Sequence, residues 1–241
     1  MRPAGFAGFS GVPLMKNAMR KISGLVSVLL LLTNQPTMGQ DVELMPPPPL
    51  DPAQVRGVME KAVNGFIRPG YDHFRQSADR LEGSMKAFCA SPSQTTDEAA
   101  KAAFVDTVAS WSTIEIVRVG PVIEQNRFER VLYYPDKKGL GLKQVQRYLS
   151  EKDESVTSAD GLKGKSVAAQ GLGALEFVLY GTGAEELLDK KGDFRCRFGA
   201  AIAGNIANVA AELSDSWNAP DGAQKNWTQP GADNPVFRDE R

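Results

Sequence analysis

The stretch Gln170–Gly183 (QGLGALEFVLYGTG) holds the clearest candidate for chemistry, the carboxylate of Glu176. Leu172, Leu175 and Leu179 recur at steps of three and four, which predicts the apolar face of a helix. Glu176 falls beside that face, so its carboxylate should point into a groove or a seam between helices. A carboxylate there needs a cation, water or a ligand, because burying a bare charge is costly. We therefore predict a ligand-binding or metal-binding role for Glu176.

Four glycines frame this helix. Gly171 and Gly173 each destabilise a helix by about 1 kcal/mol relative to alanine, so they indicate that another backbone comes close. Gly181 and Gly183 are expected to end the helix at its carboxyl terminus.

Two arginines, Arg127 and Arg130, lie in the polar stretch EQNRFERVLYYPD at positions 124–136. They are candidates to hold a carboxylate, either that of Glu176 or one carried by an anionic ligand. Ion pairing on a helix surface explains the same residues more simply. A salt bridge from Glu176 to Arg118, Arg127 or Arg130 is the alternative to its role as a ligand residue.

His73 is the only histidine of the chain. If its helix folded onto that of Glu176, the two residues could share a metal ion; a surface or packing role is the simpler interpretation. A zinc site of the peptidase type takes about three protein ligands and a water, which one histidine and scattered carboxylates supply poorly.

Cys89 and Cys196 are the two cysteines of the chain. In an exported protein an isolated pair favours a disulfide over a metal site. The disulfide would close a loop of about 108 residues, worth roughly 3–5 kcal/mol in the chain-entropy model. Two buried free thiols are the alternative.

The start of the chain has the pattern of a targeting segment. Lys16, Arg20 and Lys21 precede the apolar run ISGLVSVLLLLT, which is shorter than the ~20 residues that span a bilayer. We predict a signal peptide over residues 1–39 and a Pro-rich linker over 40–50, with no membrane span after cleavage. An uncleaved membrane anchor is the alternative.

The rest of the chain has the apolar periodicity of helices. Long segments with this period cover residues 51–88, 104–117 and 194–217, and Pro69-Gly70 should break or kink the first of them. Asn205 falls on an apolar face and is expected to bond to another helix. The first segment begins with an apolar stripe of helical period: Val55, Val58, Met59, Ala62, Val63 and Phe66. It continues with residues that are predicted to pack along a seam of the bundle: Tyr71, Phe74, Ala78, Leu81, Met85 and Phe88.

No segment alternates as a strand does, so the predicted fold class is all-α, an up-and-down helical bundle over residues 51–218. Residues 219–241 are rich in Pro, Gly and Asn and should be irregular. The 241 residues, 42% hydrophobic and 24% charged, suit one or two globular domains. A formal net charge of −1 gives no reason to expect nucleic acid as a partner.

The run Gly171-Leu172-Gly173-Ala174-Leu175-Glu176 resembles the signature Gly-x-His-x-x-Glu of the imelysin family of bacterial cell-envelope proteins, with Gly173 at the histidine position. A second region is similar to the same family: Trp111, Ile114, Arg118-Val119-Gly120-Pro121, Asn126-Arg127, Tyr134-Pro135-Asp136, Gly139 and Gln144. The resemblance implies two related helical bundles in tandem, of which this chain would hold the first. An apolar seam would then be exposed and could form a homodimer.

The resemblance also implies a periplasmic location, an envelope or iron-transport partner, and a divalent metal or iron at the signature. The family's metal site and its peptidase label rest on the His–Glu pair. Because Gly173 has no imidazole, we expect a non-enzymatic protein that binds a metal ion or small ligand, or docks to an envelope partner, in iron uptake. A metallopeptidase that uses Glu176, and a structural remnant without a ligand, are the alternatives.

Overall fold

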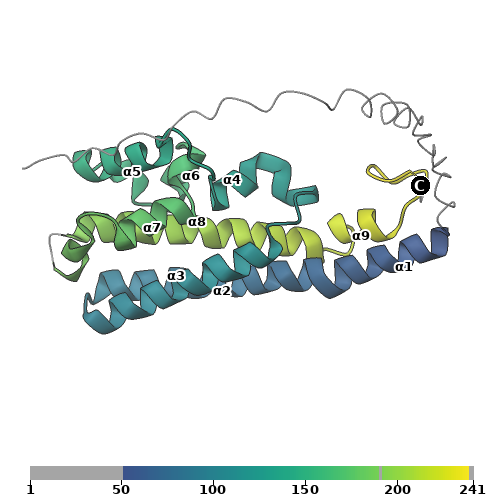
Figure 1. Ribbon diagram of the computed structural model, residues 1–241, viewed down its shortest axis with the longest axis horizontal. Helices are drawn as coiled ribbons and strands as arrows, with labels where there is room; N and C mark the ends of the chain where they lie inside the picture. The colour runs from purple at the N-terminus through teal and green to yellow at the C-terminus, as the bar shows by residue number, and fades with distance from the viewer. Residues whose placement is uncertain (1–50, 190–191, 239–241) are drawn as a thin grey trace, which may run out of the picture. The chain divides into compact units, whose positions relative to one another are not determined.

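The computed structural model describes residues 51–189 and 192–238, and all regular structure within them is helical, without a strand (Figure 1). The predicted fold class, an all-α helical bundle, is confirmed. The predicted signal peptide (1–39) and the linker over residues 40–50 lie outside the described residues. No helix in the described part of the chain is long and apolar enough to cross a membrane.

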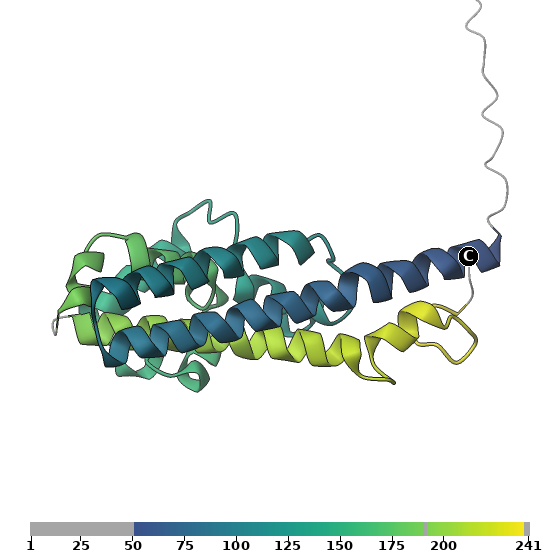
Figure 2. The same ribbon diagram turned by 90° about the horizontal axis from the view of Figure 1, so that it is seen from below.

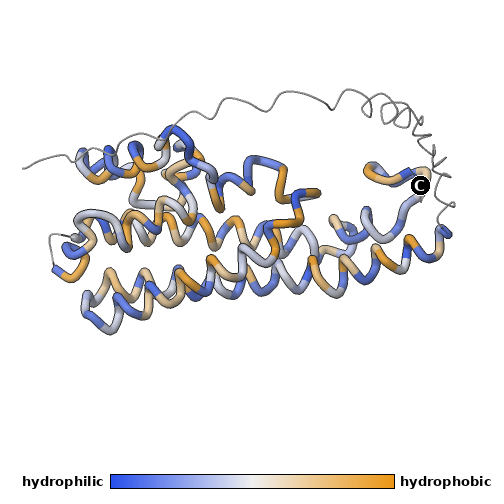
Figure 3. Tube along the Cα trace, in the orientation of Figure 1, coloured by the Kyte–Doolittle hydropathy of each residue, from blue (hydrophilic) through white to orange (hydrophobic). Residues whose placement is uncertain are grey.

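Three long helices form the centre: α2 (Arg68–Ala90), α3 (Gln94–Ile114) and α8 (Asp193–Asn218). α2 packs along both α3 and α8, and the two views show these helices side by side (Figure 2). Ser93 ends the turn between α2 and α3, where its hydroxyl accepts from the N–H of Thr96 at 3.2 Å. Apolar and polar residues alternate along the long helices, as their period predicts (Figure 3).

Shorter helices cover the rest of α8, and those between residues 127 and 163 lie on its side away from α2 (Figure 1). They are α4 (Arg127–Val131), α5 (Leu140–Glu151), α6 (Ala159–Lys163) and α7 (Leu172–Tyr180), joined by the 3-10 segments η2 (Gly120–Asn126), η3 (Glu154–Val156), η4 (Val167–Ala169) and η5 (Ala184–Leu188). α8 is therefore covered on both sides, which explains why most of its residues are buried.

The first helix passes through Pro69 without a break, which was one of the two outcomes predicted at Pro69-Gly70. α1 (Pro52–Ala62) continues through a π-helical segment, η1 (Val63–Ile67), directly into α2. Arg68 donates its N–H to the carbonyl of Val63, five residues back. Proline has no N–H and its ring crowds the carbonyl four residues earlier, so the wider π turn lets the helix continue.

The residues predicted to pack along a bundle seam are all buried in α2, namely Tyr71, Phe74, Ala78, Leu81, Met85 and Phe88, whereas the apolar stripe of α1 is mostly not part of the core. None of the residues of α1 is buried, and Val58 is 65% exposed. Phe66, in η1, is 42% exposed, whereas Val63 is buried as predicted. α1 extends past the three long helices (Figure 2). Apart from η1, which continues the same helix, it packs mainly against α9 (Ala223–Thr228).

The C-terminal segment is less irregular than predicted, because it contains α9. The ring of Trp227 in α9 lies 6.0 Å from that of Trp217 and 5.0 Å from that of Phe237. The side chain of Asn234 accepts from the N–H groups of Val236 and Phe237. These tertiary contacts order a segment whose local sequence shows no helical period.

Candidate functional site

The helix predicted at the signature is α7, and its predicted apolar face is confirmed. Leu172, Leu175 and Leu179 are all buried. Gly171 precedes α7 at a close approach between backbones, because a β-carbon there would lie 2.2 Å from the carbonyl oxygen of Val131. At Gly173 a β-carbon would meet nothing within 4 Å. Of the two signature glycines, the packing therefore requires only Gly171.

Arg195 of α8 holds the carboxyl end of α7, and sequence analysis did not identify it. Arg195 is 7% exposed as a residue and forms no ion pair among the described residues; burial lowers its pKa, while Glu186 and Glu185 raise it. It also lies over the Phe177 ring, 5.4 Å from the centroid. In place of an ion pair, its N–H groups donate to main-chain carbonyls at and just after the end of the helix: Phe177, Val178, Gly181 and Thr182. These carbonyls carry the negative end of the helix dipole, so the charge suits the position.

A groove of about 210 Å³ runs beside Glu176, and we call it the signature groove. Residues of α3 and α7, with Leu132 after α4, form its walls: Phe104, Val108, Trp111, Ser112, Glu115, Leu132, Leu172, Gly173 and Glu176. The ring of Tyr180, at the end of α7, packs 5.9 Å from that of Phe104 and so joins the two helices. Most of the lining is apolar, and two carboxylates stand on it.

Both carboxylates of the signature groove are unpaired. Within the described residues neither Glu115 nor Glu176 accepts a hydrogen bond or forms an ion pair, so the alternative of a salt bridge from Glu176 to an arginine is not found. Glu176 is exposed and Glu115 half-buried. Burial raises the pKa of the nearby Tyr180 hydroxyl, and the negative charge of Glu176 raises it further. The groove is thus an apolar surface with two uncompensated negative charges.

Arg127 and Arg130 do not line this groove; both are buried in a polar network. Nε of Arg127 donates to Glu212 of α8 at 2.8 Å. Nη2 of Arg130 donates to Oδ1 of Asn205 at 2.8 Å, and Nε donates to the side chain of Gln170. Asn205 in turn donates to the carbonyl of Gln170, so its predicted bond to another helix is confirmed. Burial lowers the pKa of Arg130. The two arginines hold α4 to α8 and to the start of α7.

His73 is exposed on α2 and is not part of the signature groove. The described residues contain no cluster of three or more His, Cys, Asp and Glu side chains that could hold a metal ion. The structure therefore does not bring His73 and Glu176 into one ligand set. Glu115 and Glu176 are the charged residues in the lining that a cation at the signature groove would meet.

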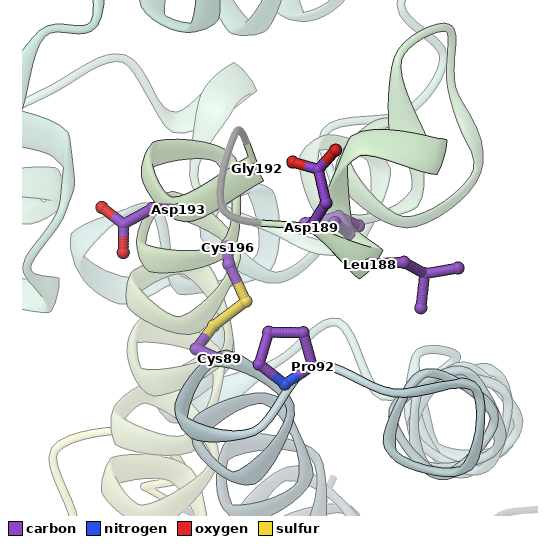
Figure 4. A pocket seen from close by; sticks show the side chains of 8 residues that line it. Cys89, Pro92, Leu188, Asp189, Gly192, Asp193 and Cys196 are labelled. Atoms are coloured by element: carbon purple, nitrogen blue, oxygen red, sulfur yellow. A yellow bond between two sulfur atoms is a disulfide. The ribbon is translucent and has the colours of Figure 1, made fainter.

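Cys89 and Cys196 form a disulfide between α2 and α8, as predicted, with Cα atoms 5.5 Å apart. Figure 4 shows the disulfide at the wall of a pocket beside Pro92, Leu188, Asp189 and Asp193. Cys196 follows Arg195 directly, so the disulfide and the arginine that holds α7 are on the same turn of α8. The covalent link fixes the end of the bundle that carries the signature helix.

The fold and this site define an all-helical protein with a groove at a glycine-flanked helix. The sequence matches the imelysin family over residues 67–240, and the chain belongs to that family. It is also similar to the crystal structure of an imelysin-like protein from Psychrobacter arcticum 273-4, with a TM-score of 0.61 and 19% identity over 70% of this chain. The chain spans about half of that protein, 51% of its length. No curated protein matches the sequence.

Proposed function

We propose that this protein is an exported, non-enzymatic member of the imelysin family that binds a positively charged group in the signature groove. One observation carries the proposal: Glu115 and Glu176 both stand unpaired on the same apolar groove. A cation held in the groove would be attracted by both charges.

The size of the signature groove limits the ligand. Its volume of about 210 Å³ is smaller than the roughly 300–1,000 Å³ of pockets that enclose small organic molecules. A metal ion with its waters fits this space, as does one lysine or arginine side chain. The ligand is therefore either a metal ion such as iron or a basic side chain of an envelope partner. Both are positively charged.

The non-enzymatic assignment rests on position 173. A catalytic zinc site takes about three protein ligands, usually including imidazole, and keeps one position for water. The signature groove offers two carboxylates, and Gly173 supplies no donor atom. A hydrated ion could bind there, but the groove does not supply the ligand set of a metallopeptidase.

The location and the biological role are part of the same proposal. Residues 1–39 have the composition of a signal peptide, and a disulfide between Cys89 and Cys196 suits the oxidising periplasm. Family resemblance supports a role in iron uptake at the cell envelope. Binding without catalysis is what such a role requires of the signature groove.

The test is calorimetric titration of the purified protein with Fe²⁺, with Zn²⁺, and with an amphipathic peptide that carries one lysine on its apolar face. Glu115→Gln and Glu176→Gln should each weaken binding of the true ligand on the order of tenfold. Glu60→Gln removes an equal charge from exposed α1 and should leave binding unchanged. The same peptide with acetylated lysine separates charge from apolar contact.

Saturable binding of a metal identifies the ion as ligand, and binding of the lysine peptide alone identifies a partner. If no probe binds, or if both groove variants bind as well as the wild type, the proposal fails. Metal-dependent cleavage of a protein substrate that is lost in Glu176→Gln would overturn the non-enzymatic assignment.

A further inference from the structure

A second groove, of about 410 Å³, lies where the chain passes from α3 through η2 and α4 to Pro135. We call it the tyrosine groove. Six of its nine lining residues are apolar or aromatic: Ile123, Phe128, Leu132, Tyr133, Tyr134 and Pro135. Tyr134 is 79% exposed and Ile123 62% exposed. Large apolar side chains gathered at the surface indicate a surface that a ligand or partner covers.

Arg118 is the only cation in the lining of the tyrosine groove. Its guanidinium stacks on Phe128, with 4.4 Å between Cζ and the ring centroid. Among the described residues it makes no ion pair and its side chain donates no hydrogen bond. Stacking fixes the plane of a guanidinium and leaves its N–H edge free, which is the arrangement that receives a carboxylate with two parallel hydrogen bonds.

Two consecutive residues hold the rim of the tyrosine groove in a left-handed backbone conformation. Gln125 has φ 54° and Asn126 has φ 55°, and Asn126 lines the groove. Such conformations in residues with a side chain are unfavourable and persist where the surrounding structure imposes them. The rim is therefore a built feature of the fold.

One residue of the lining opposes an anion. Glu129 is exposed, forms no ion pair with Arg118, and would repel a negative ligand. Its presence makes a test possible, because its removal should strengthen anion binding whereas removal of Arg118 should weaken it.

We propose that the tyrosine groove binds a small organic carboxylate with an aromatic body. Arg118 would receive the carboxylate, and Tyr133, Tyr134 and Ile123 would cover the ring. The volume of about 410 Å³ lies within the roughly 300–1,000 Å³ of small-molecule pockets, unlike that of the signature groove. The proposal is independent of the proposed function, because only the tyrosine groove has a cation in its lining and the two grooves share only Leu132.

The experiment uses 2-naphthoate as the probe, with the neutral alcohol 2-naphthylmethanol and with acetate for comparison. Binding is followed by calorimetry and mapped by amide chemical shifts in the full chain. We expect saturable binding of 2-naphthoate, at least about tenfold weaker binding of the alcohol and of acetate, and shifts centred on residues 118 and 123–135.

Arg118→Gln should reduce the affinity for 2-naphthoate at least about tenfold, and Glu129→Gln should raise it. Arg147→Gln is the matched control, because Arg147 is also exposed and lies over an aromatic ring, that of Tyr148, outside the groove. Equal binding of the alcohol, equal binding in Arg118→Gln, or an equal loss in Arg147→Gln would each overturn the proposal. Circular dichroism checks that every variant is folded.

Discussion

Nε of Arg195 on α8 donates to the carbonyl oxygen of Val178 on α7 at 2.9 Å. The same guanidinium donates to three further carbonyls, that of Phe177 in the last turn of α7 and those of Gly181 and Thr182 just after it. One buried cation thus takes the place of the capping groups that a helix end needs, and it holds the helix that carries Glu176. This contact couples the long central helix to the signature groove.

Replacing Arg195 with alanine should destabilise the fold by about 2–4 kcal/mol, because it removes a buried side chain and leaves the carbonyls of Val178 and Thr182 without a donor. Arg195→Lys should recover part of this loss, since lysine restores the charge but not the fork of donors. Arg197→Ala serves as the control, because its ion pairs with Glu154 and Asp193 are exposed and should contribute little to stability. Urea unfolding measures all three, and equal losses at positions 195 and 197 would contradict the capping role.

The two signature glycines should respond in opposite directions to alanine. Gly171→Ala forces a β-carbon against the carbonyl of Val131 and should cost about 1–3 kcal/mol. Gly173→Ala meets open space on a helix and should stabilise by about 0.5–1 kcal/mol. Thermal and urea unfolding of both variants give the sign of each change, and a destabilising Gly173→Ala would show that position 173 is packed.

Restoring the imidazole at position 173 should create a stronger metal site. Gly173→His places a nitrogen donor three residues before Glu176, on the same side of α7, where the structure leaves space. We expect at least about a tenfold gain in Zn²⁺ affinity, which Glu176→Gln in the same chain should abolish. Gly173→Ala is the control for the change in helix stability. A gain that persists without Glu176 would place the ion elsewhere.

The stability of the fold should fall in acid partly through Glu154. Hydrogen bonds from Arg197 hold the pKa of the Glu154 carboxyl below its ordinary value of 4.5. The folded state therefore binds this proton less readily than the unfolded state, so the contribution is present above pH 4.5 and is lost as the pH falls through the folded pKa. Urea midpoints between about pH 3 and pH 7 should fall less steeply for Glu154→Gln than for wild type. Glu129→Gln, at an exposed position, is the control and should follow the wild-type curve. If Glu154→Gln also follows the wild-type curve, the ion pair between Glu154 and Arg197 does not contribute to the pH dependence.

The helical period predicted the elements that depend on local pattern. The buried leucines of α7 and the internal bond of Asn205 follow from it, and two cysteines leave only one intramolecular pairing. The period failed at α1, where an apolar stripe needs a neighbour that this part of the molecule does not provide. It also failed at α9, which is held by Trp227 and its ring contacts rather than by its own sequence.

The partners of the charged residues could not be predicted from the helical period. Arg127 and Arg130 looked equivalent to Arg118 in the sequence, yet the first two turn into the bundle toward Glu212 and Asn205, while Arg118 faces a groove. Glu115 joins Glu176 although it lies on another helix. Local periodicity determines which face of a helix is buried, because that depends on its own residues. The identity of the partner across a seam depends on how the helices rotate and cross, and those angles are settled when the whole core packs together.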